Sequence, residues 1–204
     1  MERPFRIVAA LMTWLTLILQ YGLFIYERSS FASGTFEFFG YFTILTNCLV
    51  ALAFTAPLLS QDSRLYQFFA KPAVRAAIAL YILVVAVVYH ILLADIHNPT
   101  GLASATNIML HTLIPLLYLI DWWLFASKRP MFYGHIPYWI IYPMVYGLLT
   151  VAKGALTGNY VYPFLNATEL GWDGAFLNMV GFTIMYAIGA AGFIALGRAL
   201  SRKA

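Results

Sequence analysis

Residues 103–125 read ASATNIMLHTLIPLLYLIDWWLF, and this stretch decides the fold. It is long and apolar enough to cross a bilayer as a helix, yet it carries His111, Pro115 and Asp121. An ionisable side chain in hydrocarbon is costly, so we expect His111 to face the interior of a helix bundle or a wet cavity. Pro115 removes the backbone hydrogen bond to the residue four positions earlier, which leaves the carbonyl of His111 without that donor. The other helices are therefore expected to surround His111.

The composition is that of an integral membrane protein. Of 204 residues, 62% are hydrophobic and 10% are charged, and the mean hydropathy is +0.79. About six spans of roughly 20 residues would use most of the chain, which predicts a single domain over residues 1–204. The net charge of +4 comes from basic residues at helix ends, which favours lipid contact and orientation over nucleic-acid binding. The single cysteine, Cys48, excludes an intrachain disulfide.

The hydropathy pattern predicts an all-α bundle of six transmembrane helices at residues 5–26, 36–59, 74–93, 103–125, 136–152 and 174–196. Lysine and arginine placement gives the orientation, because these residues concentrate in cytoplasmic loops. Only Arg28 and Lys153 fall on one side, and the other ten of the 12 fall opposite: Arg3, Arg6, Arg64, Lys71, Arg75, Lys128, Arg129, Arg198, Arg202 and Lys203. Both termini are therefore expected to be cytoplasmic. The hydropathy shows no pair of broken helices in matching halves, which argues against a transporter.

Polar residues gather in the outer half of this predicted bundle. Thr43, Thr46 and Asn47 share one face of the second span because they are spaced three and four residues apart. Thr43 is expected roughly 10 Å from the outer end of its span and His111 roughly 12 Å, so the two share a level. The third span brings His90 close to the same end.

A threonine hydroxyl is a weak nucleophile unless a base lies beside it, and a neutral imidazole is the usual base. Thr43 and His111 would be the minimum pair. The alternatives are hydrogen bonding between helices for the threonines and Asn47, and a structural role for His111. His90 either orients His111, binds a substrate carboxylate or meets water at the interface, and His90 and His111 together could also be axial ligands of a haem.

Other candidate sites are weaker. The chain has no metal-binding spacing such as HExxH or CxxC, so we expect no metal ion. Asp121 stands beside Trp122 and Trp123, a composition typical of a membrane interface, and is expected to anchor the inner end of its helix by pairing with a base or reaching water.

The motifs YFTILTN at 41–47, HTLIPLLYLIDWWLF at 111–125 and YPMVYGLLTVAKGALTGNYVYPFLN at 142–166 resemble the androgen-induced and androgen-dependent TFPI-regulating protein family of transmembrane threonine hydrolases, especially its bacterial members. The similarity covers most of the chain. It implies cleavage of fatty acid esters of hydroxy fatty acids by an intramembrane threonine and histidine. By position in the motifs these fall on Thr43 and His111, with Thr46 as the alternative nucleophile, because TILTN replaces the animal threonine-phenylalanine-isoleucine-aspartate.

The sequence thus predicts an intramembrane lipid-ester hydrolase that takes its substrate from the bilayer and needs no cofactor. Asn47 or His90 would hold the oxyanion or orient the base, with Thr46 in the surrounding shell. The alternative is a non-enzymatic membrane protein, either a haem-binding electron carrier or a small-molecule carrier. The bacterial resemblance implies the inner (plasma) membrane.

Overall fold

The computed structural model describes residues 1–127 and 131–201, and the described chain is helical without strands. It forms two compact units, Met1–Ser127 and Lys128–Ala204. The single domain predicted over residues 1–204 stays a prediction, as does the cytoplasmic placement of both termini. Lys128, Arg129, Arg202 and Lys203, which the orientation argument used, lie outside the described residues.

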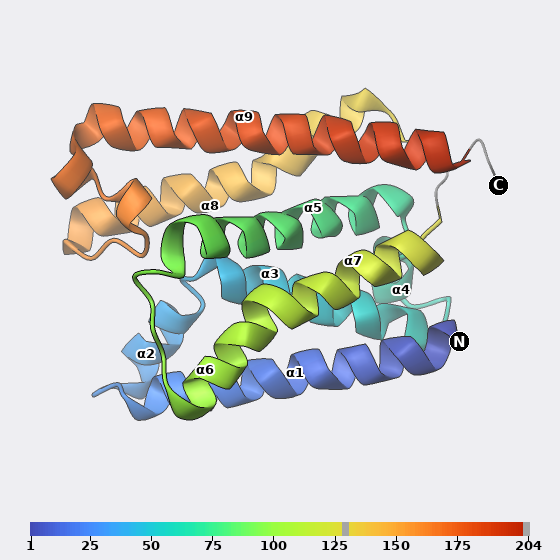
Figure 1. The fold of residues 1–204 in the computed structure, drawn as a ribbon, viewed down its shortest axis with the longest axis horizontal. Helices are drawn as coiled ribbons and strands as arrows, with labels where there is room; N and C mark the ends of the chain where they lie inside the picture. Colours follow the sequence, from blue (N-terminus) through green and yellow to red (C-terminus); the bar gives the residue numbers. More distant parts are fainter. Residues whose placement is uncertain (128–130, 202–204) are drawn as a thin grey trace. The chain divides into compact units, whose positions relative to one another are not determined.

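Unit 1 is a bundle of antiparallel helices (Figure 1). Its elements are α1 (Glu2–Tyr26), α2 (Phe31–Phe38), α3 (Phe42–Thr55), the 3₁₀ turn η1 (Ala56–Leu58), α4 (Arg64–Phe69), α5 (Pro72–Val88), the π-turn η2 (Tyr89–Leu93), α6 (Gly101–Ile108), the π-turn η3 (Met109–Leu113) and α7 (Ile114–Phe125). Because α6, η3 and α7 follow without a break, they form one continuous span, Gly101–Phe125. The packing brings α3 and α5 against this span and α1 against α3.

Unit 2 contains η4 (Tyr133–His135), α8 (Ile136–Thr157), η5 (Pro163–Leu165) and α9 (Ala167–Ser201). The two long helices pack against each other, as Figure 1 shows. Gly171 has a non-helical backbone, with φ 71° and ψ 163°, and interrupts α9 near its start. The uninterrupted part of α9 therefore begins close to residue 174, where the last span is predicted.

Five of the six predicted membrane helices are confirmed, in the predicted order, and the second is corrected. Five helices of the described chain are long and apolar enough to cross a membrane, and the number is six when the bent pair Phe31–Phe38 and Phe42–Leu58 is counted as one crossing. The continuous helix predicted at 36–59 is wrong, because the chain bends there by 75°. Tyr41 has an extended backbone (φ −90°, ψ 129°), and the amides of Gly40 and Tyr41 bond to carbonyls only three residues back. The helical ladder stops at residue 39 and restarts at Phe42.

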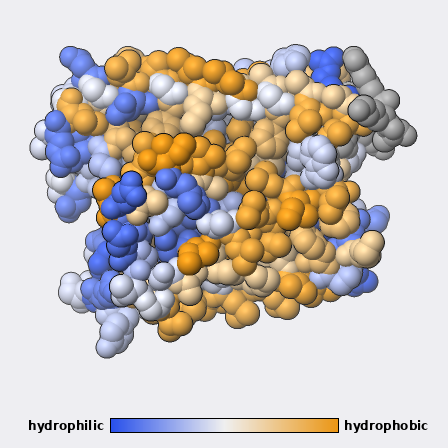
Figure 2. Space-filling view, in the orientation of Figure 1, coloured by the Kyte–Doolittle hydropathy of each residue, from blue (hydrophilic) through white to orange (hydrophobic). Residues whose placement is uncertain are grey.

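The surface of unit 1 divides by polarity. Figure 2 shows hydrophobic side chains over α7, and hydrophilic side chains at the end of the unit where α6 begins. Beyond the charged first turn of α1, the large exposed side chains on α1 and α7 are mostly apolar, including Leu15, Ile18, Leu116 and Leu124. A helix that exposes leucine and isoleucine along its middle is suited to lipid rather than water.

Candidate functional site

The structure brings Thr43 and His111, the predicted nucleophile and base, into contact. The Oγ1 atom of Thr43 lies 3.3 Å from Nε2 of His111, and both residues are half-buried. Thr43 is the second residue of α3, and His111 is the third residue of η3. The predicted depth assumed that Thr43 lay inside a continuous helix, whereas it belongs to the first turn after the bend. That position matters, because the first amides of a helix have no intrahelical acceptor.

Hydrogen bonding defines which ring nitrogen of His111 faces the threonine as an acceptor. Nδ1 lies 3.0 Å from the backbone carbonyl of Asn107, one turn earlier in the same span. A carbonyl can only accept, so Nδ1 carries the hydrogen, and in the neutral ring Nε2 keeps its lone pair. The hydroxyl of Thr43 therefore donates to Nε2, which is the arrangement of a nucleophile and its base.

Tyr89 and Asn107 hold the imidazole in place. The Tyr89 ring stacks on the His111 ring with centroids 3.9 Å apart and planes 20° apart. The side-chain amide of Asn107 donates to the hydroxyl of Tyr89, and its backbone carbonyl accepts from Nδ1 of His111. Asn107 therefore holds both rings. Neither Tyr89 nor Asn107 is among the site residues predicted from the sequence. The spacing of four between Asn107 and His111, which places them on one helical face, was an available signal.

The π-turn η3 explains how α3 is fixed beside His111. The amide of Ile114 bonds to the carbonyl of Met109, five residues back, and Pro115 has no amide hydrogen. The carbonyl of Leu110 thus loses both backbone donors that normally reach it, and Nδ2 of Asn47 donates to it at 3.3 Å. The carbonyl that takes a side-chain donor is therefore that of Leu110, one residue before His111, where the missing backbone donor was predicted.

Asn47, predicted with His90 to hold the oxyanion or to orient the base, uses its side-chain amide on backbone carbonyls. Its Nδ2 also donates to the carbonyl of Thr43, at 2.9 Å, so both amide hydrogens are in use. Asn47 therefore ties α3 to η3 and supports the geometry of the pair. Its Oδ1 is buried and has no hydrogen-bond partner among the described residues. Thr46, on the same helix, is fully buried.

His90 has partners of its own. Its Nδ1 lies 2.8 Å from the carbonyl of Ala86, and its Nε2 lies 3.3 Å from Oγ1 of Thr112. Axial ligation of one haem would require Nε2 atoms of His90 and His111 to converge on one iron, whereas each faces a different threonine. Among residues 1–127 and 131–201, no group of three or more His, Cys, Asp or Glu is placed to hold a metal ion.

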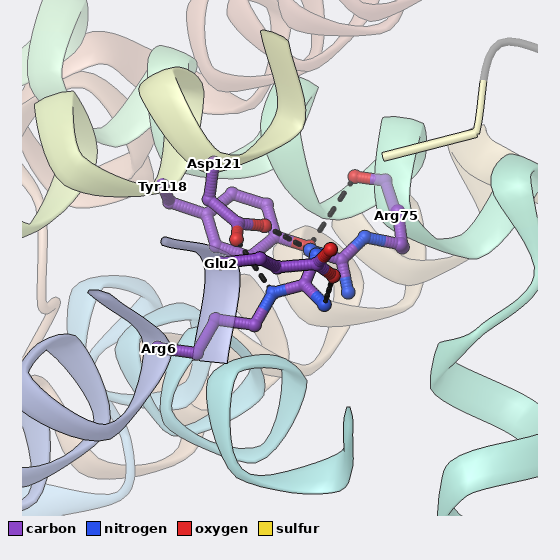
Figure 3. Close-up of polar contacts among 5 residues, drawn as sticks. All are labelled: Glu2, Arg6, Arg75, Tyr118 and Asp121. Atoms are coloured by element: carbon purple, nitrogen blue, oxygen red, sulfur yellow. Dashed lines mark hydrogen bonds and ion pairs between the residues drawn. The ribbon is translucent and has the colours of Figure 1, made fainter. Parts of the chain in front are cut away.

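A buried ionic cluster lies in the same unit (Figure 3). Asp121 on α7 is fully buried, accepts from Nε of Arg6 at 2.7 Å, and forms a second ion pair with Arg75. Arg6 also pairs with Glu2, and the hydroxyl of Tyr118 donates to the carbonyl of Arg75 at 3.4 Å. The cluster places the beginnings of α1 and α5 and the end of α7 at one end of unit 1, as alternating spans require.

The pairing with a base that was predicted for Asp121 is confirmed, and the alternative, contact with water, is wrong because the carboxylate is fully enclosed. The prediction also used Arg6 and Arg75 only as orientation signals, although both fall inside the predicted spans 5–26 and 74–93. Charged residues inside membrane segments usually pair with one another. That rule, applied to these three residues, was the signal for the cluster.

Comparisons of the chain with protein-family models, curated proteins and solved structures found no match.

Proposed function

We propose that the chain is an intramembrane hydrolase of lipid esters, with Thr43 as nucleophile and His111 as base. The observation that supports this most directly is the contact of Thr43 Oγ1 with His111 Nε2, in a ring whose Nδ1 is committed to the Asn107 carbonyl. A threonine hydroxyl reacts only when a base takes its proton, and this tautomer leaves the base nitrogen pointing at the hydroxyl.

The reaction has two halves. Nε2 of His111 takes the hydroxyl proton while Oγ1 of Thr43 forms a bond to the ester carbonyl carbon. The tetrahedral intermediate then expels the alcohol, which takes the proton from Nε2, and an acyl group stays on Thr43. In the second half Nε2 deprotonates a water molecule that attacks the acyl carbon, and the fatty acid leaves as the Thr43 hydroxyl is restored.

The first turn of α3 offers donors for the oxyanion of the tetrahedral intermediate. The first intrahelical bond of α3 runs from the amide of Leu45 to the carbonyl of Tyr41, at 3.1 Å. The amides of Thr43 and Ile44 come before Leu45 in the first turn, so they have no carbonyl acceptor within the helix. The side chain of the N-cap residue Tyr41 does not cap them either. A helix start presents such amides together with the positive end of the helix dipole, which suits a developing negative charge.

The surroundings favour a lipid substrate. The pair lies beside apolar helices whose exposed side chains suit hydrocarbon, so an acyl chain can reach it from the bilayer. The resemblance to transmembrane threonine hydrolases makes fatty acid esters of hydroxy fatty acids, or similar acyl esters, the substrate class of this proposal. The bacterial inner (plasma) membrane is its location.

The first test is labelling of purified protein by a long-chain fluorophosphonate, with peptide mapping and ester turnover measured in parallel. We expect the adduct on Thr43, its loss in Thr43→Ala, and labelling slowed about 10²- to 10⁴-fold in His111→Ala. Thr13→Ala is the matched control, because Thr13 is buried and bonds to the Ala9 carbonyl of its own helix. Absence of an adduct on folded wild-type protein, or an adduct independent of His111, would overturn the proposal.

The second test addresses the oxyanion donors. Tyr41→Ser supplies a hydroxyl that caps the amide of Thr43 or Ile44, so it competes with the oxyanion and should slow turnover about 10²-fold without destabilising α3. Tyr41→Ala removes the same ring and adds no cap, which makes it the control. Equal turnover in the two variants would show that these amides do not hold the oxyanion.

A further inference from the structure

A second threonine and histidine pair lies next to the first and joins the span Gly101–Phe125 to η2. The Oγ1 atom of Thr112 is 3.3 Å from Nε2 of His90, which belongs to the neighbouring π-turn η2. Thr112 directly follows His111 in η3. Neither Thr112 nor the pair as a unit has a part in the hydrolase mechanism proposed for Thr43.

The second pair has the same hydrogen-bond plan as the first. Nδ1 of His90 contacts the carbonyl of Ala86, four residues back, just as Nδ1 of His111 contacts that of Asn107. Since a carbonyl only accepts, the hydrogen is on Nδ1 in both rings, and in each neutral ring Nε2 receives the threonine hydroxyl. Both histidines also belong to π-turns, which are rare and occur frequently at functional sites.

The two pairs differ in access. The His90 side chain is exposed and Thr112 is half-buried, whereas both members of the first pair are half-buried. Thr112 lies within a continuous span instead of at a helix start, so it lacks the first-turn amides that precede the ladder of α3. Because it is exposed, the pair can be reached by acyl groups from outside the bundle. Because it lacks those amide donors, we expect Thr112 to react more slowly than Thr43, and mainly with reactive esters.

We propose that Thr112 and His90 form a second nucleophilic site that takes acyl groups from lipid esters at the exposed surface of unit 1. Nε2 of His90 takes the hydroxyl proton as Oγ1 of Thr112 bonds to the ester carbonyl carbon. The alcohol leaves with that proton, and the product is an ester of Thr112. Water, deprotonated by His90, then releases the fatty acid and restores the hydroxyl.

The test uses the full chain in detergent or nanodiscs, carrying Thr43→Ala so that the first pair cannot react. We expect a long-chain fluorophosphonate to label Thr112 in this protein, as mapped by mass spectrometry. His90→Gln, which keeps a hydrogen-bond acceptor but is not a base, should slow that labelling about 10²-fold, whereas the control Thr13→Ala, at a buried threonine bonded within its own helix, should leave it unchanged. Circular dichroism of each variant checks that the helices are intact.

The outcomes separate the two sites. Lack of a Thr112 adduct in folded Thr43→Ala protein overturns this inference, and the pair is then only a hydrogen bond between two helices. A Thr112 adduct that forms equally fast in His90→Gln overturns it as well. Labelling of Thr43 in wild-type protein is read from a different peptide, so the proposed hydrolase can fail while this site stands, or the reverse.

Discussion

Removal of the Asp121 carboxylate tests whether the buried ionic cluster stabilises unit 1. The side chain of Asp121 is 0% exposed, and those of Arg6 and Arg75 are 7% and 4% exposed. In Asp121→Ala, Arg6 keeps its pair with Glu2, whereas Arg75 is left buried without a carboxylate. One uncompensated buried charge costs about 3–5 kcal/mol, so we expect a loss of that size and not twice as much.

The free energy of unfolding can be measured by circular dichroism in mixed micelles of increasing denaturing detergent. Glu37→Ala is the matched control, because Glu37 forms an exposed ion pair with Arg28: the Glu37 side chain is 43% exposed and that of Arg28 is 34% exposed. That pair should contribute about 0–1 kcal/mol. Adding Arg75→Met to Asp121→Ala removes the uncompensated charge and should restore most of the lost stability, since apolar replacements of buried ion pairs are well tolerated.

Two results would refute this reasoning. The first is an Asp121→Ala loss no larger than that of Glu37→Ala, which would mean that the cluster is hydrated or unimportant. The second is a failure of Arg75→Met to recover stability in the Asp121→Ala background, which would mean that the cost does not arise from the charge of Arg75.

Three further predictions follow from contacts elsewhere. Tyr89→Phe keeps the stacked ring but removes the hydroxyl that Asn107 contacts, so ester turnover should fall less than about tenfold, whereas Tyr89→Leu also removes the stack and should lower it further; steady-state kinetics distinguishes the two. Asn47→Leu removes the side-chain donor from the Leu110 carbonyl and should cost about 1–3 kcal/mol in the same unfolding assay, while an unchanged value contradicts its bridging role. Gly154→Ala would drive its new methyl group into the ring of Tyr160 and should cost about 1–3 kcal/mol, whereas Gly192→Ala, with open space around it, should be neutral or stabilising.

The hydropathy pattern was sufficient for most of the fold, because a span of about 20 apolar residues has few alternatives to a membrane helix. It failed between Phe36 and Leu59. Phe38, Phe39 and Tyr41 are all apolar enough for a membrane helix, so hydropathy cannot register that Tyr41 adopts an extended backbone. A single glycine at position 40 is also common inside membrane helices and gave no clear break signal.

The candidate pair was predictable from polar residues in apolar helices, but its support was not. Thr43 and His111 stood out because such side chains are rare in membrane helices. The second and fourth spans run in the same direction, which puts the two residues at one level. The aromatic Tyr89 looked like ordinary apolar content, although its ring covers the imidazole. The π-turns were also invisible, since one extra residue in a turn changes neither composition nor mean hydropathy.

The π-turn η3 also sets the helical phase between the two polar clusters. A π-turn holds about one residue more than an α-turn, so side chains beyond it are rotated by about 100° relative to an uninterrupted helix. His111 lies in η3 and Asp121 lies beyond it, on the same span. Deleting one residue there, for example Met109, would convert the π-turn into an α-turn and leave Asp121 facing Arg6 and Arg75, while the span stayed long and apolar enough to insert. Single-residue deletions in η3 should therefore leave the ionic cluster intact, whereas a single-residue insertion between η3 and Asp121 should rotate Asp121 away from both arginines.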